Sequence, residues 1–152
     1  MTATSRPGWD EYFMNFAMAA RLRGTCDRKQ VGAIIVVDHG IVASGYNGAA
    51  PGEPHCDEVG HDLVTLANGR QNCVRTVHAE ENAILQAARE RGGVKGGTIY
   101  TNTYPCWPCA RKIISAGLLR VVYDSDYNND ERVLLAFPRR GIEVVRFKRN
   151  DV

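Results

Sequence analysis

Apolar residues along this chain follow two patterns. A spacing of three or four residues predicts helices, and short apolar runs predict strands. From residue 9 to residue 22 they recur every three or four positions, which is typical of an amphipathic helix. Two short runs rich in valine and isoleucine follow, "VGAIIVVD" (31–38) and "IVASGY" (41–46). The pair "HG" joins these runs, so they predict a β-hairpin.

The second half of the chain alternates between the two patterns. The predicted elements are helices over about 78–91, 108–117 and about 129–137, and strands over 97–102, 119–124 and 142–147. Gly117 closes the second of these helices, as glycine commonly does. A hairpin followed by β-α-β units predicts an α/β fold in three α-β-α layers, with a mixed five-stranded sheet between the helices.

Residues 47–75 sustain neither period and are rich in glycine, proline, asparagine and aspartate. A connection this long is uncommon in a compact domain and is usually functional. We therefore expect a single domain over residues 1–152, with residues 1–8 as a flexible tail and residues 47–75 as a long loop insertion.

Composition narrows the classes of function. Apolar residues make up 44% of the 152 residues and charged residues 24%, which is ordinary for a globular protein. The net charge of +2 and the lack of a basic run argue against stable nucleic-acid binding but suit a small anionic substrate. No run of about 18 apolar residues could span a membrane. The N-terminus lacks the features of a signal peptide, so we expect a cytoplasmic protein.

Five cysteines and four histidines are an unusual inventory for such a chain. An odd number of cysteines without an export signal argues against a disulfide framework. In a reducing compartment, cysteines more often bind a metal or take part in catalysis.

Cys106 and Cys109 lie in "PCWPC", where a predicted strand gives way to a helix. Two cysteines with this spacing can bind one tetrahedral zinc. The free N–H groups and the dipole of the helix N-terminus lower the pKa of such thiols. The motif alone leaves three interpretations open: a zinc site, a thioredoxin-like redox pair, or two buried and inert thiols.

His78 favours the zinc site among these three interpretations, because it also begins a predicted helix, directly after the long connection. A sheet between the two helices could bring their N-termini together, at the carboxyl ends of the strands. Glu80 follows two residues later, in "VHAEEN". The combination H-x-E with a later P-C-x-x-C is the signature of zinc-dependent nucleobase deaminases.

The sequence resembles the deoxycytidylate (dCMP) deaminase family, within the cytidine deaminase-like superfamily, over nearly its whole length. The matching segments, in order, are "CDRKQVGAIIV", "ASGYNGAAPG", "VRTVHAEENAI" and "TNTYPCWPCARKIISAG". The resemblance implies a cytidine deaminase-like fold and the hydrolysis of dCMP to dUMP and ammonia, which supplies dUMP for thymidylate synthesis. Family members commonly assemble as hexamers, so the resemblance also implies a homo-oligomer.

The resemblance assigns roles to the motif residues. His78, Cys106 and Cys109 would hold a catalytic zinc and leave its fourth position to water, as catalytic zinc sites do. Glu80 would carry protons during the reaction. Helix geometry alone does not choose it, because at about 100° per residue Glu81 lies angularly nearer to His78.

A second, structural zinc occurs in some members of the family. Cys26 and Cys56 lie where the resemblance would place two of its ligands. Cys73 and His61 could complete a Cys₃His tetrahedron, with His55 as the alternative to His61. Such a metal would order a segment that lacks apolar anchors. The other interpretation is a set of scattered thiols.

Four residues are candidates for substrate binding. Asn47, in "GYNG", lies on the loop that the family uses to hold the sugar, and Tyr127 matches a tyrosine of the family's phosphate region. Arg28 and Lys29 are candidates for the phosphate from their charge alone.

Two alternatives remain open at this level. The first is a deaminase of another cytosine nucleotide or nucleoside, including a 5-modified one. The second is a non-catalytic zinc-binding accessory protein of the competence type. A purely structural module has no need of Glu80 or of an open zinc position, so the sequence favours the enzyme.

Overall fold

A computed structural model describes residues 5–127 and 129–148. Its principal helices are α1 (Trp9–Arg21), α3 (Ala79–Arg91), α4 (Trp107–Ser115) and α5 (Glu131–Arg140). Its principal strands are β1 (Gly32–Val37), β2 (Gly40–Tyr46), β7 (Thr98–Thr103), β8 (Arg120–Ser125) and β9 (Glu143–Arg146). None of the helices in the described residues is both long and apolar enough to cross a membrane.

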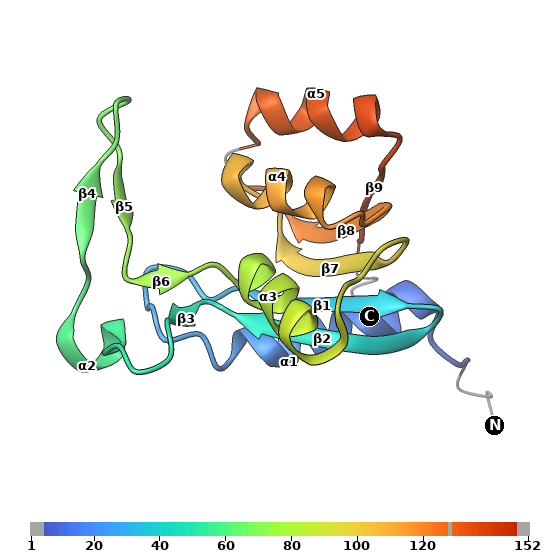
Figure 1. The fold of residues 1–152 in the computed structure, drawn as a ribbon, viewed down its shortest axis with the longest axis horizontal. Coiled ribbons are helices and arrows are strands. Elements are labelled where there is room, and N and C mark those ends of the chain that lie inside the picture. Colours follow the sequence, from blue (N-terminus) through green and yellow to red (C-terminus); the bar gives the residue numbers. More distant parts are fainter. Residues whose placement is uncertain (1–4, 128, 149–152) are drawn as a thin grey trace.

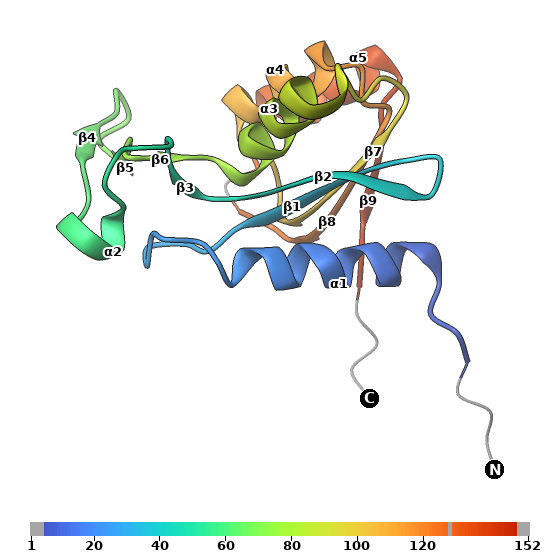
Figure 2. The same cartoon turned by 60° about the horizontal axis from the view of Figure 1, so that its bottom comes forward.

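The five strands form one mixed sheet in the order β2-β1-β7-β8-β9 (Figure 1). β1 pairs antiparallel with both β2 and β7, whereas β8 pairs parallel with β7 and with β9. α1 covers one face of the sheet, and α3, α4 and α5 cover the other (Figure 2). The predicted three-layer α/β fold with a mixed five-stranded sheet is thereby confirmed.

Alternation along β1 explains how one strand serves two cores. Ile34 and Val36 pack with Phe13 and Met14 of α1 on one face. Their neighbours along the strand point to the opposite face, because successive side chains of a strand alternate. There Ile35 packs in the larger core, whose helical members include Ala79, Ala83, Ala87, Ile113, Val133 and Phe137.

Gly45 on β2 allows α3 to approach the sheet closely. A Cβ atom at this position would lie 2.3 Å from the Ala79 carbonyl oxygen and 2.6 Å from the Ala83 backbone nitrogen. Real Cβ atoms do not approach other atoms so closely. The missing side chain of Gly45 therefore sets the position of the first turns of α3, and with them the position of His78.

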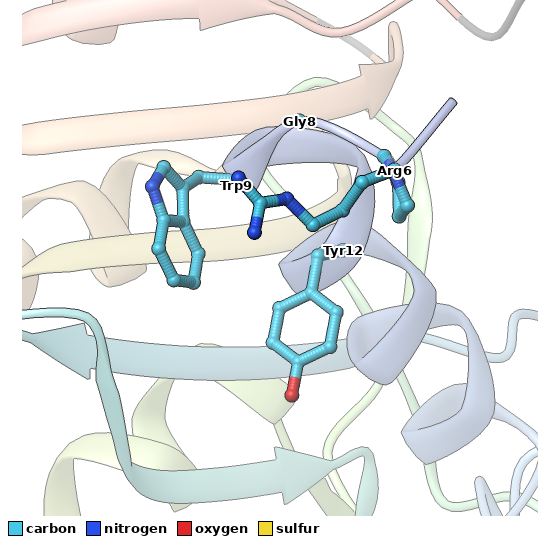
Figure 3. Close-up of a pocket in the computed structure, with 5 residues that line it drawn as sticks. Arg6, Gly8, Trp9 and Tyr12 are labelled. Atoms are coloured by element: carbon cyan, nitrogen blue, oxygen red, sulfur yellow. The ribbon is translucent and has the colours of Figure 1, made fainter.

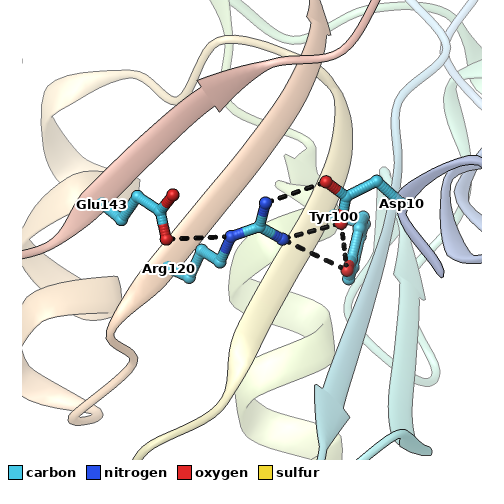
Figure 4. A network of polar contacts seen from close by, with 4 residues as sticks. All are labelled: Asp10, Tyr100, Arg120 and Glu143. Atoms are coloured by element: carbon cyan, nitrogen blue, oxygen red, sulfur yellow. Dashed lines mark hydrogen bonds and ion pairs between the residues drawn. The ribbon is translucent and has the colours of Figure 1, made fainter. Parts of the chain in front are cut away.

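A polar network joins α1 to strands β7 and β8 of the sheet (Figure 4). Arg120 of β8 donates two hydrogen bonds to the Asp10 carboxylate, at 2.7 and 2.8 Å. The Tyr100 hydroxyl donates to the same carboxylate at 2.7 Å. On its other side, Arg120 donates to Glu143 at 3.1 Å. The Arg120 hydrogen bonds lower the pKa of Asp10.

The segment predicted as a long loop contains short elements that its sequence pattern does not reveal. They are β3 (Gly48–Ala49), α2 (Cys56–Val59), β4 (Leu63–Thr65) and β5 (Gln71–Cys73), and β6 (Thr76–Val77) follows directly after the segment. β3 pairs with β6 and β4 pairs with β5. Strands of two or three residues are too short to establish a period. Figure 1 shows the β4–β5 hairpin standing away from the main sheet, on the side where α3 and α4 begin.

Other boundaries differ from the prediction by a few residues. α5 begins at Glu131, where the Asp130 side chain accepts a hydrogen bond from the Arg132 amide. It continues through Pro138 to Arg140, beyond the predicted end at residue 137. Gly141, at φ 74°, ends the helix in the left-handed conformation. Residues 1–4 of the predicted tail lie outside the described residues.

Candidate metal centre and catalytic site

His78, Cys106 and Cys109 come together where two helices begin. His78 and Cys106 are the N-cap residues of α3 and α4, and Cys109 lies in the first turn of α4. The Nδ1 atom of His78 lies 3.4 Å from Cys106 Sγ and 3.3 Å from Cys109 Sγ. Two ligands of one tetrahedral zinc, with usual Zn–S and Zn–N bonds, lie about 3.5 Å apart. The three donors therefore fit one zinc ion, and three donors leave one position open.

The thiols of Cys106 and Cys109 differ in pKa. A hydrogen bond from Cys109, together with the nearby His78, lowers the pKa of Cys106 to about 4, although burial works in the opposite direction. The same partnership raises the pKa of Cys109. A lowered pKa favours the thiolate, the form in which cysteine binds metals.

Glu80 lies against this cluster and Glu81 does not. Glu80 is 3% exposed and hydrogen-bonds with Cys109, and burial raises its pKa. Glu81 instead lies 3.6 Å from the Lys112 ammonium, with its side chain partly exposed. The argument from helix angles is wrong because His78 has φ −66° and ψ 152°, an extended conformation. The helical rotation therefore starts only at Ala79.

Lys29 and Tyr127 form one wall beside the cluster. The Lys29 ammonium donates to the Thr103 hydroxyl at 2.9 Å and lies 3.2 Å from the centre of the Tyr127 ring. Burial lowers the pKa of Lys29 to about 8, while the charges of Glu80 and Cys106 oppose this shift. Tyr127 is half exposed, so this wall reaches the surface.

Arg28, the other predicted cation, points elsewhere. It is exposed and donates to the Gln71 carbonyl of β5 at 3.5 Å. Of the three phosphate candidates, the structure brings Lys29 and Tyr127 together and directs Arg28 to the hairpin.

Asn47 is buried and uses its side-chain amide to bind backbone. Its oxygen accepts from the Val31 amide at 2.8 Å, and its nitrogen donates to the Lys29 carbonyl. Asn102 of β7 binds the same segment, one residue further along it. Its side-chain oxygen accepts from the Gly32 amide at 2.8 Å, and its nitrogen donates to the Gln30 carbonyl at 3.1 Å. The two asparagines hold residues 29–32 and thereby orient Lys29. Sequence reasoning missed Asn102, for which a polar amide inside "TIYTNT" was the available signal.

The four remaining candidate ligands form a second cluster at the base of the insertion. Cys26, Cys56, His61 and Cys73 place one ligand atom each within 4.8 Å of the others. Cys26 Sγ lies 3.5 Å from His61 Nδ1, and Cys56 Sγ lies 3.6 Å from Cys73 Sγ. These four donors have the number and spacing of a closed tetrahedral site.

His61, rather than His55, belongs to this cluster. The other ring nitrogen of His61 lies 2.8 Å from an Asp27 carboxylate oxygen, the kind of partner that orients a metal-binding imidazole. His55 caps α2, and its Nδ1 lies 3.0 Å from the Thr25 hydroxyl and 3.2 Å from the Ala49 amide nitrogen.

The thiols of the second cluster also differ in pKa. For Cys73, hydrogen bonds from the Arg75 and Asp62 backbones outweigh the effect of burial and lower the pKa to about 6. Burial and the neighbouring thiol of Cys73 raise the pKa of Cys56 to about 12. The lowered pKa of Cys73 favours its thiolate form.

A surface groove lies at the start of α1 (Figure 3). It is lined by Arg6, Pro7, Gly8, Trp9 and Tyr12. Cys26 follows the far end of α1, a helix of 13 residues that is about 20 Å long. None of these five described residues carries a metal-binding side chain, so we do not assign the chemistry to the groove.

Comparisons with known proteins agree with this geometry. The family model of the cytidine and deoxycytidylate deaminase zinc-binding region matches residues 7–125. ComE operon protein 2 of Bacillus subtilis is 37% identical, over 97% of this chain and 75% of that protein. The deoxycytidylate deaminase of Mycobacterium phage D29 is 40% identical, over 80% of this chain and 98% of that enzyme. The chain spans only 45% and 47% of the longer deoxycytidylate deaminases of Schizosaccharomyces pombe and Saccharomyces cerevisiae.

A solved structure shares the fold. The dCMP deaminase of cyanophage S-TIM5, in complex with dCMP and dUMP, superposes with a TM-score of 0.78 and 27% sequence identity. The match covers 95% of this chain and all of that one.

Proposed function

This chain belongs to the cytidine and deoxycytidylate deaminase family, and we propose that it hydrolyses dCMP to dUMP and ammonia. The observation that carries the proposal is a buried carboxyl group, Glu80, lying against three zinc-type ligands at the meeting point of two helix N-termini. The similarity to enzymes named deoxycytidylate deaminase supports dCMP as the substrate.

His78, Cys106 and Cys109 would hold the catalytic zinc. When bound, zinc supplies a water of lowered pKa that can add to C4 of cytosine. Glu80 would take one proton from the attacking water and pass it to N3, and would then carry the remaining hydroxyl proton from C4–OH to the departing amino group. The C4–N bond then breaks, and ammonia leaves as C4 becomes the carbonyl carbon of uracil.

Lys29 and Tyr127 would bind the phosphate end of the nucleotide. Their wall begins beside Cys106 and reaches the surface, so it is suited to the part of the substrate furthest from the reacting carbon. We assign Asn47 to the sugar side of the site. Because both ends of its amide already bond to backbone, it acts there chiefly by shaping the segment that carries Lys29.

Cys26, Cys56, Cys73 and His61 would hold a second, structural zinc. Four protein donors leave no position for a reacting water, which is the arrangement of structural zinc sites. The domain is then a single unit over residues 1–152, with residues 47–75 as an insertion that this metal secures. We further propose a cytoplasmic homo-oligomer, in line with the hexamers common in the family.

The similarity to ComE operon protein 2 supports one alternative, a competence-related accessory role without catalysis. Glu80 distinguishes the two roles. Burying a carboxyl group costs free energy, and a module that only binds zinc has no use for that group beside the metal.

Ammonia release tests the proposal directly. Zinc-loaded protein would be incubated with dCMP, CMP, dCTP, deoxycytidine and 5-methyl-dCMP, with the Glu80→Gln variant as the control. We expect dCMP to have the highest kcat/KM. If wild-type protein with a full complement of zinc releases ammonia from none of these compounds, the accessory role is the correct one.

A further inference from the structure

The β4–β5 hairpin brings a cation to the rim of the proposed catalytic site. Arg70 directly precedes β5, and its guanidinium carbon lies 5.9 Å from the centre of the Tyr127 ring. Next to it, Gln71 accepts the hydrogen bond from Arg28. The hairpin, which Figure 1 shows on the side where α3 and α4 begin, thus meets the segments before β1 and after β8.

Two cationic side chains contact the aromatic ring of Tyr127. Lys29 lies over the ring at 3.2 Å and Arg70 approaches it at 5.9 Å. The negative face of an aromatic ring attracts both. Together they place positive charge around this ring, and positive charge at the rim of a site favours an anionic ligand there. A phosphate suits such a place, because arginine donates to phosphate oxygens in bidentate fashion and lysine binds them as a point charge.

Lys29, Tyr127 and Arg70 lie at the end of the site where the phosphate of a bound nucleotide would be. Lys29 is close enough to Glu80 and Cys106 to interact with their charges, and it donates to Thr103, three residues before Cys106. Tyr127 and Arg70 lie further out, where both are exposed. In a cytidine nucleotide the amino group and the phosphate are at opposite ends, so a phosphate would reach this rim while the base lies at the metal.

We propose that Arg70 is a specificity-determining residue that binds the 5′-phosphate together with Lys29, and so separates nucleoside monophosphates from nucleosides. The proposal rests on the proposed deamination of a cytosine nucleotide and identifies the group that selects its phosphate.

The second cluster fixes where Arg70 lies. His61 precedes β4 by two residues and Cys73 ends β5, so both strands of the hairpin are anchored at their base by cluster members. A metal bound there would position the tip of the hairpin, which carries Arg70. It would thereby influence substrate selection through the hairpin.

Arg70→Gln tests the proposal, with Arg89→Gln on α3 as a control that removes the same charge from an exposed ion pair with Glu90. For Arg70→Gln we expect KM for dCMP to rise about tenfold, the usual loss for one charge-assisted hydrogen bond, with kcat unchanged. KM for deoxycytidine should not change, Arg70→Lys should recover part of the loss, and Arg89→Gln should behave as wild type.

Binding of the product separates this inference from the proposed function. Calorimetry should show dUMP bound about tenfold more weakly by Arg70→Gln, with deoxyuridine unaffected. This comparison needs no turnover, so it tests Arg70 even if the wild-type protein deaminates nothing. Equal losses for nucleotide and nucleoside, a fall in kcat alone, or no change in dUMP affinity would each overturn the assignment.

Discussion

At the scale of single residues, the conformation of His78 decides which of two carboxyl groups faces the cysteines. An extended N-cap residue resets the helical rotation, so Glu80 turns toward the cysteines and Glu81 toward Lys112. The motif in the sequence predicted the cluster, since "HAE" and "PCWPC" hold their ligands at fixed spacing. Helix geometry could not predict the direction of Glu80, because it assumes that His78 is helical.

The two glutamates should differ sharply when each is replaced. We expect Glu80→Gln to lower kcat for dCMP by at least about 10²-fold, the usual size of a lost proton transfer. Glu81→Gln should change kcat by no more than a few-fold. Both variants should keep their fold and zinc content, checked by circular dichroism and metal analysis. If the two variants exchange these behaviours, the assignment of Glu80 is wrong.

At the scale of elements, periodicity predicted those helices and strands that are long enough to show it. The five main strands and four main helices were all predicted, with boundaries within a few residues. β3 to β6 were not, because two or three residues cannot establish a period. The end of α5 was also missed, because proline usually stops a helix, whereas Pro138 lies in the last turn.

The contact between β2 and α3 should not tolerate a methyl group. Gly45→Ala would place its Cβ against the Ala79 carbonyl and force α3 away from the sheet. We expect the free energy of unfolding to fall by about 1–3 kcal/mol, the usual cost of overpacking, and activity to fall because His78 moves. Gly40→Ala is the control, since its Cβ would have 3.5 Å to the nearest atom. Urea unfolding that gives equal stability for both variants would contradict this account.

The attachment of α1 should depend on pH through Asp10. The folded-state pKa of Asp10 lies below 3.8, so its ionised form stabilises the protein at neutral pH. This contribution is lost as the pH falls below 3.8 and through the folded-state value. We expect Asp10→Asn to lower the free energy of unfolding by about 1 kcal/mol at pH 7, after allowance for partial exposure. The difference should shrink near pH 3.

Glu143→Gln serves as the matched control for this experiment, because Glu143 meets the same arginine with a more exposed side chain. Its effect at pH 7 should stay below about 0.5 kcal/mol. An Asp10→Asn penalty that is the same at pH 3 and pH 7 would show that ionisation of Asp10 is not its source.

At the scale of the whole molecule, two clusters of zinc-type ligands lie in different parts of the structure. One lies where α3 and α4 begin, and the other lies at the base of the insertion. Sequence alone proposed both sets of ligands but could not place the insertion relative to the site. Its contacts with Arg28 and Tyr127 involve segments that are far apart in sequence and carry no pattern.

The second cluster should bind its own metal. We expect two zinc ions per chain in fully loaded wild-type protein and one in Cys56→Ser or Cys73→Ser. These variants should also melt at a lower temperature, because binding at a closed site is coupled to folding. Limited proteolysis should become faster within residues 47–75. A single zinc per fully loaded wild-type chain, unchanged in both variants, would return these cysteines to scattered thiols.

The central claim is that the cluster of His78, Cys106 and Cys109 deaminates dCMP with zinc and Glu80. The most direct test is to remove the metal with a chelator, restore it stepwise, and follow the conversion of dCMP to dUMP. The Cys106→Ala, Cys109→Ala double variant, which keeps the second cluster, is measured in parallel. We predict that the rate of dUMP formation rises with zinc at the first cluster, and that the double variant holds one zinc and forms no dUMP. Full activity in the metal-free protein or in the double variant would contradict the account.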